Sequence, residues 1–378
     1  MAFEHYIRNG QKWLRCGYTT GTCSALGAAG ATRLLLTGQA PDQVELMTPK
    51  GLMVEAPLLE PHLIEGGACA AICKDGGDDA DVTHGHLVVA SVYKRDAPGV
   101  EIDGGLGVGR VTKPGLDQPV GNAAINHVPR QMIAAAVQAE CDRAGYNGGI
   151  MVVISVPDGE ELAKKTFNPV LGIQGGISIL GTSGIVEPMS LQAIVDTIGV
   201  EIKAARATGS KNLLLTPGNY GMDFLKANGL DVPGVPLVKY SNFIGEALDM
   251  AAAEGFEQVL LVGHIGKLVK VAGGIMNTHS RWADCRLEIF TAYAALAGAS
   301  HDTLQKLMTA ATTDAAIHLL DEAGLREPIM AEIIKAIQLH LERRAAGSFH
   351  IGAMVFSNEY GLLGQTDTVE EIMNIWRQ

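Results

Sequence analysis

Several features are scarce or absent in this 378-residue sequence, and each absence argues against a class of function. Aromatic residues make up only 5% of the chain. The formal net charge is −12, and the sequence contains no run of Lys and Arg residues. Nucleic-acid binding is therefore not expected, because neither a stacking platform nor a basic surface is available. No apolar stretch has the length of a membrane span, and the first residues contain no apolar signal core. We therefore expect a cytoplasmic protein without membrane contact.

Motifs that would indicate other chemistries are also missing. The six cysteines form no C-x-x-C pair and no zinc-like spacing, a pattern that fits reduced thiols. The phosphate-binding string GxxxxGK(S/T) does not occur, and Ser183 does not lie in a G-x-S-x-G nucleophile elbow. The sequence therefore gives little support to phosphoryl or acyl transfer.

The chain does contain enough apolar material for two cores. Hydrophobic residues make up 47% of it, the mean hydropathy is +0.17, and the length favours two domains. Strands and helices are mixed up to about residue 175, whereas from residue 176 short apolar strands alternate with helical patterns. We therefore predict an α/β protein with an N-terminal α+β domain (1–175) and a C-terminal Rossmann-like, doubly wound α/β domain (176–378).

Two helices can be located in the first domain from their end signals. The first is predicted to be capped by Thr19, Thr20 or Thr22 and to end at Gly38. The second is predicted from Pro129 to about residue 144, because proline suits the first helical turn and a glycine follows the last apolar position. Between these helices, two short apolar runs separated by a Lys-Gly pair predict a hairpin.

The predicted strands of the second domain end in small or polar residues. GISILG leads to Gly181–Gly184, NLLLTPG to Gly218 and Asn219, and QVLLVGH contains Gly263 and His264. Doubly wound sheets bind their ligands beyond the carboxyl ends of the strands, so we expect these positions at a ligand site. For His264, an equally good interpretation is a hydrogen-bonded loop residue.

The string DGGLGVG, Asp103–Gly109, matches the D-x-G-x-G-x-G pattern that opens many Rossmann-type methyltransferases. In those enzymes the glycines let the backbone approach the cofactor at a helix N-terminus. Here Pro114 and Gly115 soon follow, and they do not extend a helix. A cofactor-contacting loop and a structural glycine turn are both open, and the context favours the turn.

An acidic loop follows the predicted strand ACAAIC. Its carboxylates and imidazoles belong to Asp75, Asp78, Asp79, Asp81, His84 and His86. Such ligands suit a divalent metal, but neither EF-hand spacing nor an HExxH helix is present. Carboxylates that bond backbone N–H groups are the favoured interpretation. A third interpretation gives one carboxylate, or His84, a part in proton transfer or substrate orientation.

Basic residues near glycine-rich turns are candidates for binding carboxylates. Arginine can bind a carboxylate at two points, whereas lysine acts as a point charge. On an acidic chain a local basic pocket would be informative, but most of these residues are expected on the solvated surface. They are Arg110, Lys113, Arg130, Lys267, Lys270 and Arg281.

Six stretches that span most of the chain carry a family likeness when they are taken together. They are Leu14–Ala31, Cys73–Gly85, Gly104–Leu116, Phe167–Ser190, Thr216–Gly221 and Gly263–Arg281. In this order they resemble the cobalt-precorrin-5B C1-methyltransferases of anaerobic cobalamin biosynthesis. One such stretch would be weak, whereas six in order make the resemblance specific.

The resemblance implies an enzyme that methylates C1 of cobalt-precorrin-5B. S-adenosylmethionine would be the co-substrate, and the products would be cobalt-precorrin-6A and S-adenosylhomocysteine. The chain itself would need no catalytic metal, because the cobalt belongs to the substrate. This chemistry mainly requires that carbon, methyl and sulfur are aligned and that water is excluded.

We therefore expect a cleft between the two domains, lined by the Thr-rich turn at Tyr18–Thr22, the acidic loop and the turn at 181–184. Bulkier residues there should lower turnover without unfolding the protein. The predicted catalytic residues are Asp79, His84 and His264, and no metal site is predicted. The predicted substrate-binding residues are Tyr18, Thr19, Thr20, Thr22, Arg110, Lys113, Thr182 and Ser183. The predicted cofactor-binding residues are Gly181, Gly184, Gly218, Asn219 and Gly263.

Two other functions are left open by the sequence. One is a non-catalytic corrinoid-binding carrier or scaffold of the same pathway. The other is a dinucleotide-dependent oxidoreductase, which would need a strand–GxGxxG–helix unit that is not evident after residue 176. The expected partner is the small-molecule corrinoid, and a homo-oligomer and transient contact with neighbouring pathway enzymes are left open.

Overall fold

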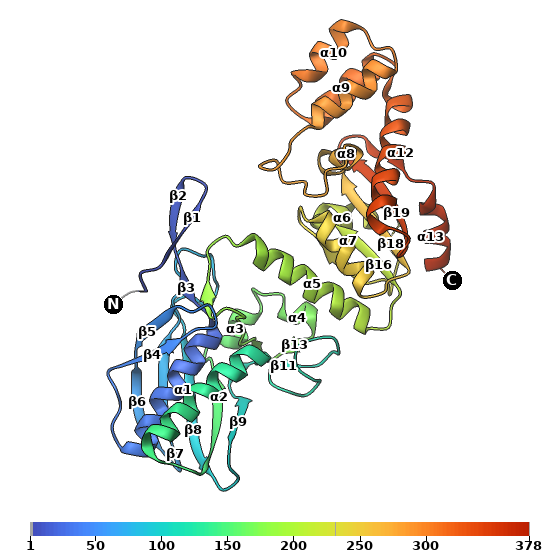
Figure 1. Cartoon of the computed structure of the whole chain (residues 1–378). Coiled ribbons are helices and arrows are strands. Elements are labelled where there is room, and N and C mark those ends of the chain that lie inside the picture. The colour runs from blue at the N-terminus through green and yellow to red at the C-terminus, as the bar shows by residue number, and fades with distance from the viewer. Residues whose placement is uncertain (1–2, 231, 378) are drawn as a thin grey trace. The chain divides into compact units, whose positions relative to one another are not determined.

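A computed structural model gives the fold of the chain and describes residues 3–230 and 232–377 (Figure 1). The protein is mixed α/β and consists of two compact units, Met1–Leu191 and Gln192–Gln378. The sequence placed the boundary at residue 175. The structure assigns residues 176–191 to the first unit, because Gly176–Ile177 and Ile185–Val186 pair with strands of that unit.

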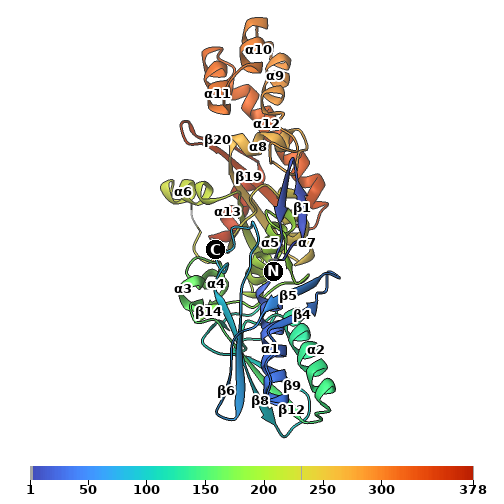
Figure 2. The same cartoon turned by 90° about the vertical axis from the view of Figure 1, so that its left-hand side faces the viewer.

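The first unit is built on a five-stranded sheet in the order β6-β7-β8-β12-β9. Neighbouring strands run antiparallel except for β12 and β9, which are parallel. The strands are β6 (Leu59–Ile64), β7 (Gly67–Cys73), β8 (Leu87–Arg95), β9 (Val100–Gly104) and β12 (Gly149–Ser155). Helices α1 (Thr20–Thr37) and α2 (His127–Ala144) pack side by side and cover one face of this sheet (Figure 2).

Short strand pairs and two short helices complete the first unit. The pairs are β1 with β2, β4 with β5, β3 with β15, β10 with β14, and β11 with β13. Their bounds are β1 (Tyr6–Asn9), β2 (Lys12–Arg15), β3 (Gly17–Tyr18), β4 (Gln43–Met47), β5 (Met53–Pro57), β10 (Gly107–Val108), β11 (Arg110–Val111), β13 (Ile173–Gln174), β14 (Gly176–Ile177) and β15 (Ile185–Val186). The short helices are α3 (Gly159–Ala163) and α4 (Asn168–Leu171).

Helix α1 forms as its end signals predict. The side chain of Thr19 accepts a hydrogen bond from Thr22 N, and Gly38 ends the helix in the left-handed conformation with φ +75°. Every residue from Thr20 to Thr32 is buried. Small Ala, Gly, Ser and Thr side chains allow this close packing against α2 on one side and the sheet on the other.

The second unit contains a five-stranded sheet in the order β17-β16-β18-β19-β20. The first four strands are parallel, and β20 is antiparallel to β19. The strands are β16 (Asn212–Thr216), β17 (Leu237–Lys239), β18 (Gln258–His264), β19 (His350–Ser357) and β20 (Gly361–Gln365). GISILG was expected to open this sheet, but Gly176–Ile177 pairs with β10 in the first unit instead.

Helices cover both faces of this parallel sheet. The helices of this unit are α5 (Leu191–Ala207), α6 (Asn219–Ala227), α7 (Ile244–Ala253), α8 (Ile265–Ala272), α9 (Arg286–Leu296), α10 (His301–Met308), α11 (Thr313–Glu322), α12 (Arg326–Ala345) and α13 (Thr368–Trp376). Of these, α9, α10 and α11 pack mainly against other helices and not on the sheet (Figure 1). Of the helices described in either unit, none combines the length and apolarity needed to cross a membrane.

Alternate strand residues enter two different cores of the second unit. Leu213 and Leu261 pack in the core that contains α5, α7, α8 and α12, whereas Leu214 and Leu260 pack in the core with α6 and α13. Strand β16 therefore leads into α6 on one face, and its neighbour β18 leads into α8 on the other. The two chain connections diverge at the carboxyl ends of β16 and β18.

Candidate functional site

The Thr-rich turn is buried against the segment that starts at Leu180. The side chain of Thr19 accepts a hydrogen bond from Thr22 N (3.2 Å), and Thr20 Oγ1 accepts one from Leu180 N (3.0 Å). Thr22 Oγ1 donates to Gly184 O (2.6 Å), and all three threonines are buried. The sequence predicted direct substrate contacts for Thr19, Thr20 and Thr22. The hydroxyls of Thr20 and Thr22 instead join two chain segments that are distant in sequence, and the hydroxyl of Thr19 caps α1.

Two predicted cofactor glycines, Gly181 and Gly184, are required by the packing of this turn. Gly181 has φ +130°, and a Cβ there would lie 2.4 Å from the side chain of Thr19. Gly184 has φ +79°, and a Cβ there would lie 2.8 Å from Thr48 Cβ. The sequence placed both at a strand end of the parallel sheet, but they belong to the first unit. Thr182, between them, is exposed.

The predicted contact residue Ser183 belongs to the same turn. Ser183 Oγ donates to Ile185 O (3.0 Å) and accepts from Ile185 N (3.3 Å). Its carbonyl accepts a hydrogen bond from Lys50 N (3.1 Å), so the turn is tied to the β4–β5 hairpin. The stretches expected to line a cleft between domains therefore contact one another within one unit.

The carboxylates of the acidic loop bind partners within the first unit. Asp75 accepts two hydrogen bonds from the Arg15 guanidinium (2.6 and 2.8 Å), and Asp81 accepts one from Lys74 Nζ (2.7 Å). Asp79 Oδ1 accepts from a backbone N–H of the segment before α5 (3.0 Å). The expected bonds from carboxylates to backbone N–H groups are confirmed. Within the described ranges, no three His, Cys, Asp or Glu residues form a metal-binding group.

Ion pairing keeps the two most buried of these carboxylates charged. Burial alone would raise the pKa of Asp75 and of Asp81. Hydrogen bonds and the charges of Arg15 and Lys74 outweigh burial, so the pKa of each carboxyl lies below its ordinary value. Neither group is therefore suited to carry a proton at neutral pH.

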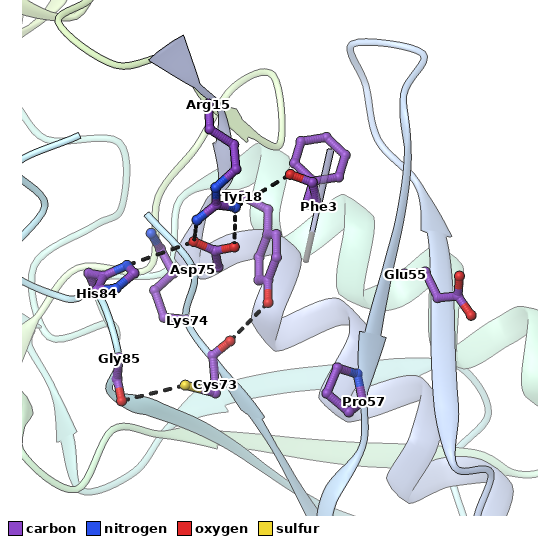
Figure 3. A pocket seen from close by; sticks show the side chains of 10 residues that line it. All are labelled: Phe3, Arg15, Tyr18, Glu55, Pro57, Cys73, Lys74, Asp75, His84 and Gly85. Atoms are coloured by element: carbon purple, nitrogen blue, oxygen red, sulfur yellow. Dashed lines mark hydrogen bonds and ion pairs between the residues drawn. The ribbon is translucent and has the colours of Figure 1, made fainter. Parts of the chain in front are cut away.

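A pocket of about 300 Å³ opens beside the acidic loop (Figure 3). Its polar and charged lining comes from Arg15, Tyr18, Glu55, Lys74, Asp75 and His84. Tyr18 donates its hydroxyl to Cys73 O (3.0 Å), and burial raises the pKa of this phenol. His84 Nδ1 accepts from Gly76 N (2.9 Å), so a neutral ring carries its proton on Nε2. The structure thus brings together two predicted site residues, Tyr18 and His84.

The glycine string Asp103–Gly109 is a packed structural turn. A Cβ at Gly107, which has φ +70°, would lie 1.9 Å from Val156 O. The predicted contact residue Arg110 makes a two-point ion pair with Asp103 (2.7 and 2.9 Å). Lys113, the other predicted contact in this region, lies with its aliphatic chain over Gly172. The structural interpretation favoured by the sequence therefore agrees with the packing.

In the second unit, the predicted cofactor residues lie at the ends of two neighbouring strands. Gly218 and Asn219 follow β16, and Gly263 is the penultimate residue of β18. A Cβ at Gly263 would lie 3.0 Å from Leu268, so packing favours glycine there. A Cβ at Gly218 would meet no other atom of the described chain within 4 Å. Of these two glycines, Gly218 is the one with open space over its backbone.

His264 ends β18 and caps α8 with its ring. Nδ1 accepts from Gly266 N (3.1 Å), and Nε2 lies 4.0 Å from Asp314 Oδ2. Asp314 Oδ1 in turn accepts from Ser357 Oγ (2.6 Å) at the end of β19. Both ring nitrogens of His264 therefore face groups of the protein itself. This geometry favours the hydrogen-bonded interpretation of His264 over the catalytic one.

The acid stability of the second unit should depend on His264. Burial lowers its pKa and outweighs the opposing charge of Asp314. In the unfolded chain His264 is therefore protonated below about pH 6.5, whereas in the folded chain it is protonated only at a lower pH. We expect the contribution of His264 to stability to be constant above pH 6.5, and to be lost as the pH falls from 6.5 through the folded pKa. Histidine NMR titration measures that pKa, and chemical unfolding at pH 7.5 and 5.5 measures the stability change.

His264→Asn is the matched control for this titration. Asparagine also caps helices well but does not titrate, so the variant should lose this part of the pH dependence. A His264 resonance that titrates above pH 6.5 would contradict the assignment.

Comparisons with known proteins assign the chain to a protein family. Family models match residues 7–188 (CbiD) and residues 277–367 (CbiD, C-terminal domain). A protein of Ruminiclostridium cellulolyticum described as cobalt-precorrin-5B C(1)-methyltransferase is 45% identical over 98% of this chain and 98% of its own length. The chain belongs to the CbiD family.

Two further curated relatives match this chain over nearly its whole length. A protein of Photorhabdus laumondii with the same description is 42% identical and covers 100% of this chain and 99% of its own. A protein of Alkaliphilus metalliredigens, again with that description, is 41% identical over 98% and 97%. The 1.9 Å crystal structure of the cobalamin biosynthesis protein cbiD from Archaeoglobus fulgidus is 29% identical, covers 73% of this chain and 86% of that chain, and has a TM-score of 0.39.

Four side chains of these sites were missed from the sequence. Arg15 and Lys74 stand beside residues that had been singled out, in RCGYTTG and CKDGG, so their position in CbiD-like stretches was an available signal. Asp314 and Ser357 offered no local signal, because one is an ordinary first-turn acid of α11 and the other ends an apolar strand. Only the fold brings them to His264.

Proposed function

We propose that this chain methylates C1 of cobalt-precorrin-5B and that S-adenosylmethionine is the methyl donor. The observation that carries the proposal is the extent of the likeness. Relatives described by this activity are 41–45% identical over 98% of the chain, so both units take part in the comparison. A carbon nucleophile needs an activated methyl group, and a sulfonium is the donor that fits this reaction.

We propose further that the donor binds at the carboxyl ends of β16 and β18, in a Rossmann-like second unit. In doubly wound sheets, ligands bind where the connections diverge to opposite faces. Here that point lies between Gly218 and Asn219 on one strand end and Gly263 on the other. The open space over Gly218 supports the proposal, because a ligand can approach the backbone there.

The chemistry assigns modest tasks to the protein. When bound, the donor supplies a methyl group on positively charged sulfur, and the cobalt enters as part of the substrate. The chain has to hold the reacting carbon in line with that methyl and keep water away. His264 and the carboxylates of the acidic loop are engaged by internal partners, so we propose that they position loops and helix ends.

We propose that the pocket of the first unit takes one acetate or propionate arm of the macrocycle. Its volume of about 300 Å³ is at the lower end of the range for ligand pockets, about 300–1,000 Å³, which suits an arm but not the ring. The side chain of His84 is 53% exposed, and its Nε2–H is a hydrogen-bond donor to a carboxylate. Tyr18 forms part of the wall, and Arg15 and Lys74 offset the negative charges of Asp75 and Glu55 in the same lining.

Gly218→Ala should weaken the binding of S-adenosylhomocysteine about tenfold or more, equal to about 1.4 kcal/mol, without lowering stability. The residue has φ 178°, extended backbone that alanine also adopts, and the protein leaves room for the methyl group. Any loss of affinity is therefore caused by contact between the added methyl group and the ligand. Calorimetric titration and the melting temperature are the two measurements.

Gly199→Ala is the matched control for this variant. Gly199 lies within α5, where a Cβ would make ordinary contact with Met250 at 3.4 Å. We expect this variant to bind S-adenosylhomocysteine like the unchanged protein. Unchanged binding in Gly218→Ala would place the donor elsewhere.

A single-turnover assay tests the function itself. The protein is mixed with cobalt-precorrin-5B and S-adenosylmethionine labelled in the methyl group, and transfer of label to the macrocycle is followed. We expect about one label per protein molecule, at C1. A corrinoid carrier would bind the macrocycle and transfer no label, and failure to bind S-adenosylhomocysteine would remove the methyltransferase proposal.

A further inference from the structure

The loop between α8 and α9, residues 273–285, is held by a buried lysine. Lys270 is 1% exposed, and its Nζ donates to Thr278 O (3.1 Å), Ala283 O (2.9 Å) and Ser280 Oγ (3.3 Å). Asp284 Oδ1 lies 3.5 Å from the same nitrogen. An ammonium has three N–H donors, so this one loop uses all of them. A buried charge is costly unless it is fully paired, and the pairing here requires one loop conformation.

The loop is also bonded to the segment that follows β17. Thr278 N donates to Asn242 O (2.9 Å), and Gly245 N donates to Met276 O (3.1 Å). Asn242 comes between the end of β17 and the start of α7. Because β17 and β16 are parallel neighbours, the loop lies at the sheet edge that also carries Gly218.

This fixed loop presents a tryptophan to solvent. Trp282 N donates to His279 O (2.9 Å), and Arg281 N donates to His279 Nδ1 (3.0 Å), so both residues belong to an ordered turn. Trp282 is nevertheless 65% exposed, whereas Trp376 of α13 is 8% exposed. An indole is a large apolar surface that is normally covered. A turn that is held by these hydrogen bonds and still leaves the indole uncovered is suited to hold a flat ligand.

We propose that Trp282 is a substrate-contact residue whose indole ring stacks on the face of the corrinoid macrocycle, with Arg281 beside it binding a carboxylate arm. This inference rests on the proposed function, which supplies a flat conjugated ring with many carboxylates. Aromatic rings bind such faces by offset stacking, and guanidinium groups bind carboxylates at two points. The loop offers both chemistries on adjacent residues. Lys270 acts as a positioning residue beneath them.

Tryptophan fluorescence tests the proposal directly. The probe is cobyrinic acid, a cobalt corrinoid with free carboxylate arms, which absorbs light and quenches nearby emission. We expect quenching in the unchanged protein and in Trp13→Phe, whose replaced residue is also exposed (67%) but lies in β2 of the first unit. In Trp282→Phe, at least half of the quenching should be lost, while the phenyl ring preserves most of the affinity.

Binding and turnover give the second readout. Trp282→Ala should raise the Kd for cobyrinic acid and the KM for cobalt-precorrin-5B about tenfold, with kcat changed less than twofold. Equal affinity in Trp282→Ala, together with full quenching in Trp282→Phe, would overturn this inference and leave the methyltransferase proposal standing. Absence of both methyl transfer and corrinoid binding in the unchanged protein would overturn both. If Trp282→Ala unfolds, the quenching of Trp282→Phe still decides.

Discussion

Gly181→Ala is expected to lower the free energy of unfolding of the first unit by about 2–6 kcal/mol. The backbone at Gly181 has φ +130°, where an L-residue is strained by about 1–3 kcal/mol. The added Cβ would also lie 2.4 Å from the side chain of Thr19, which caps α1, so one of the two segments must move. Overpacking of this kind lowers the free energy of unfolding by a further ~1–3 kcal/mol.

Calorimetry and urea unfolding measure this loss, and Gly38→Ala is the control. Gly38 caps the other end of α1 with φ +75°, but a Cβ there meets no atom of the described chain within 4 Å. It should therefore show only the backbone strain, about 1–2 kcal/mol. Equal losses in the two variants would contradict the close packing of the turn at Gly181 against Thr19. The result also tests the expectation that bulkier residues in this turn leave the fold intact, because the close approach of Gly181 to Thr19 predicts a loss of stability.

Those parts of the fold that depend on neighbouring residues could be predicted from the sequence. Helix α1 has its cap at Thr19 and its stop at Gly38, and α2 ends before Gly145, as the signals indicated. Strands β16, β18 and β19 are apolar runs whose burial on both faces matches a parallel sheet. In each case the deciding residues lie within a few positions of one another.

Contacts between distant residues could not be predicted. The hydroxyl of Thr20 bonds residue 180, and Arg15 pairs with Asp75. No periodicity links such positions, so the Thr-rich turn was interpreted as an open ligand surface. The same limit displaced the domain boundary, because Ile185–Val186 is too short to show that it pairs with Gly17–Tyr18. The role of His264 depends on which ring nitrogen meets Gly266, and only the fold shows this.

Lys270→Met is expected to destabilise the second unit by about 2–4 kcal/mol, because it leaves buried acceptors without a donor. Methionine fills much of the same volume, so packing alone changes little. The carbonyls of Thr278 and Ala283 each lose a hydrogen bond, and each buried unpaired group costs about 1–3 kcal/mol. Part of that cost is recovered if the loop opens and water reaches the carbonyls.

Lys267→Met, one turn earlier in α8, separates the loss of charge from the loss of the loop anchor. Lys267 is partly exposed, donates to Ser241 O (2.9 Å), and has its pKa lowered by burial and by the charge of Lys270. Removing a single, partly solvated hydrogen bond should cost about 1 kcal/mol or less.

Arg281 in the loop is a trypsin site, so loosening of the loop can be measured separately from global unfolding. Under native conditions, cleavage after Arg281 should accelerate in Lys270→Met and stay slow in Lys267→Met. Similar cleavage rates in both variants would mean that Lys270 does not hold the turn that presents Trp282.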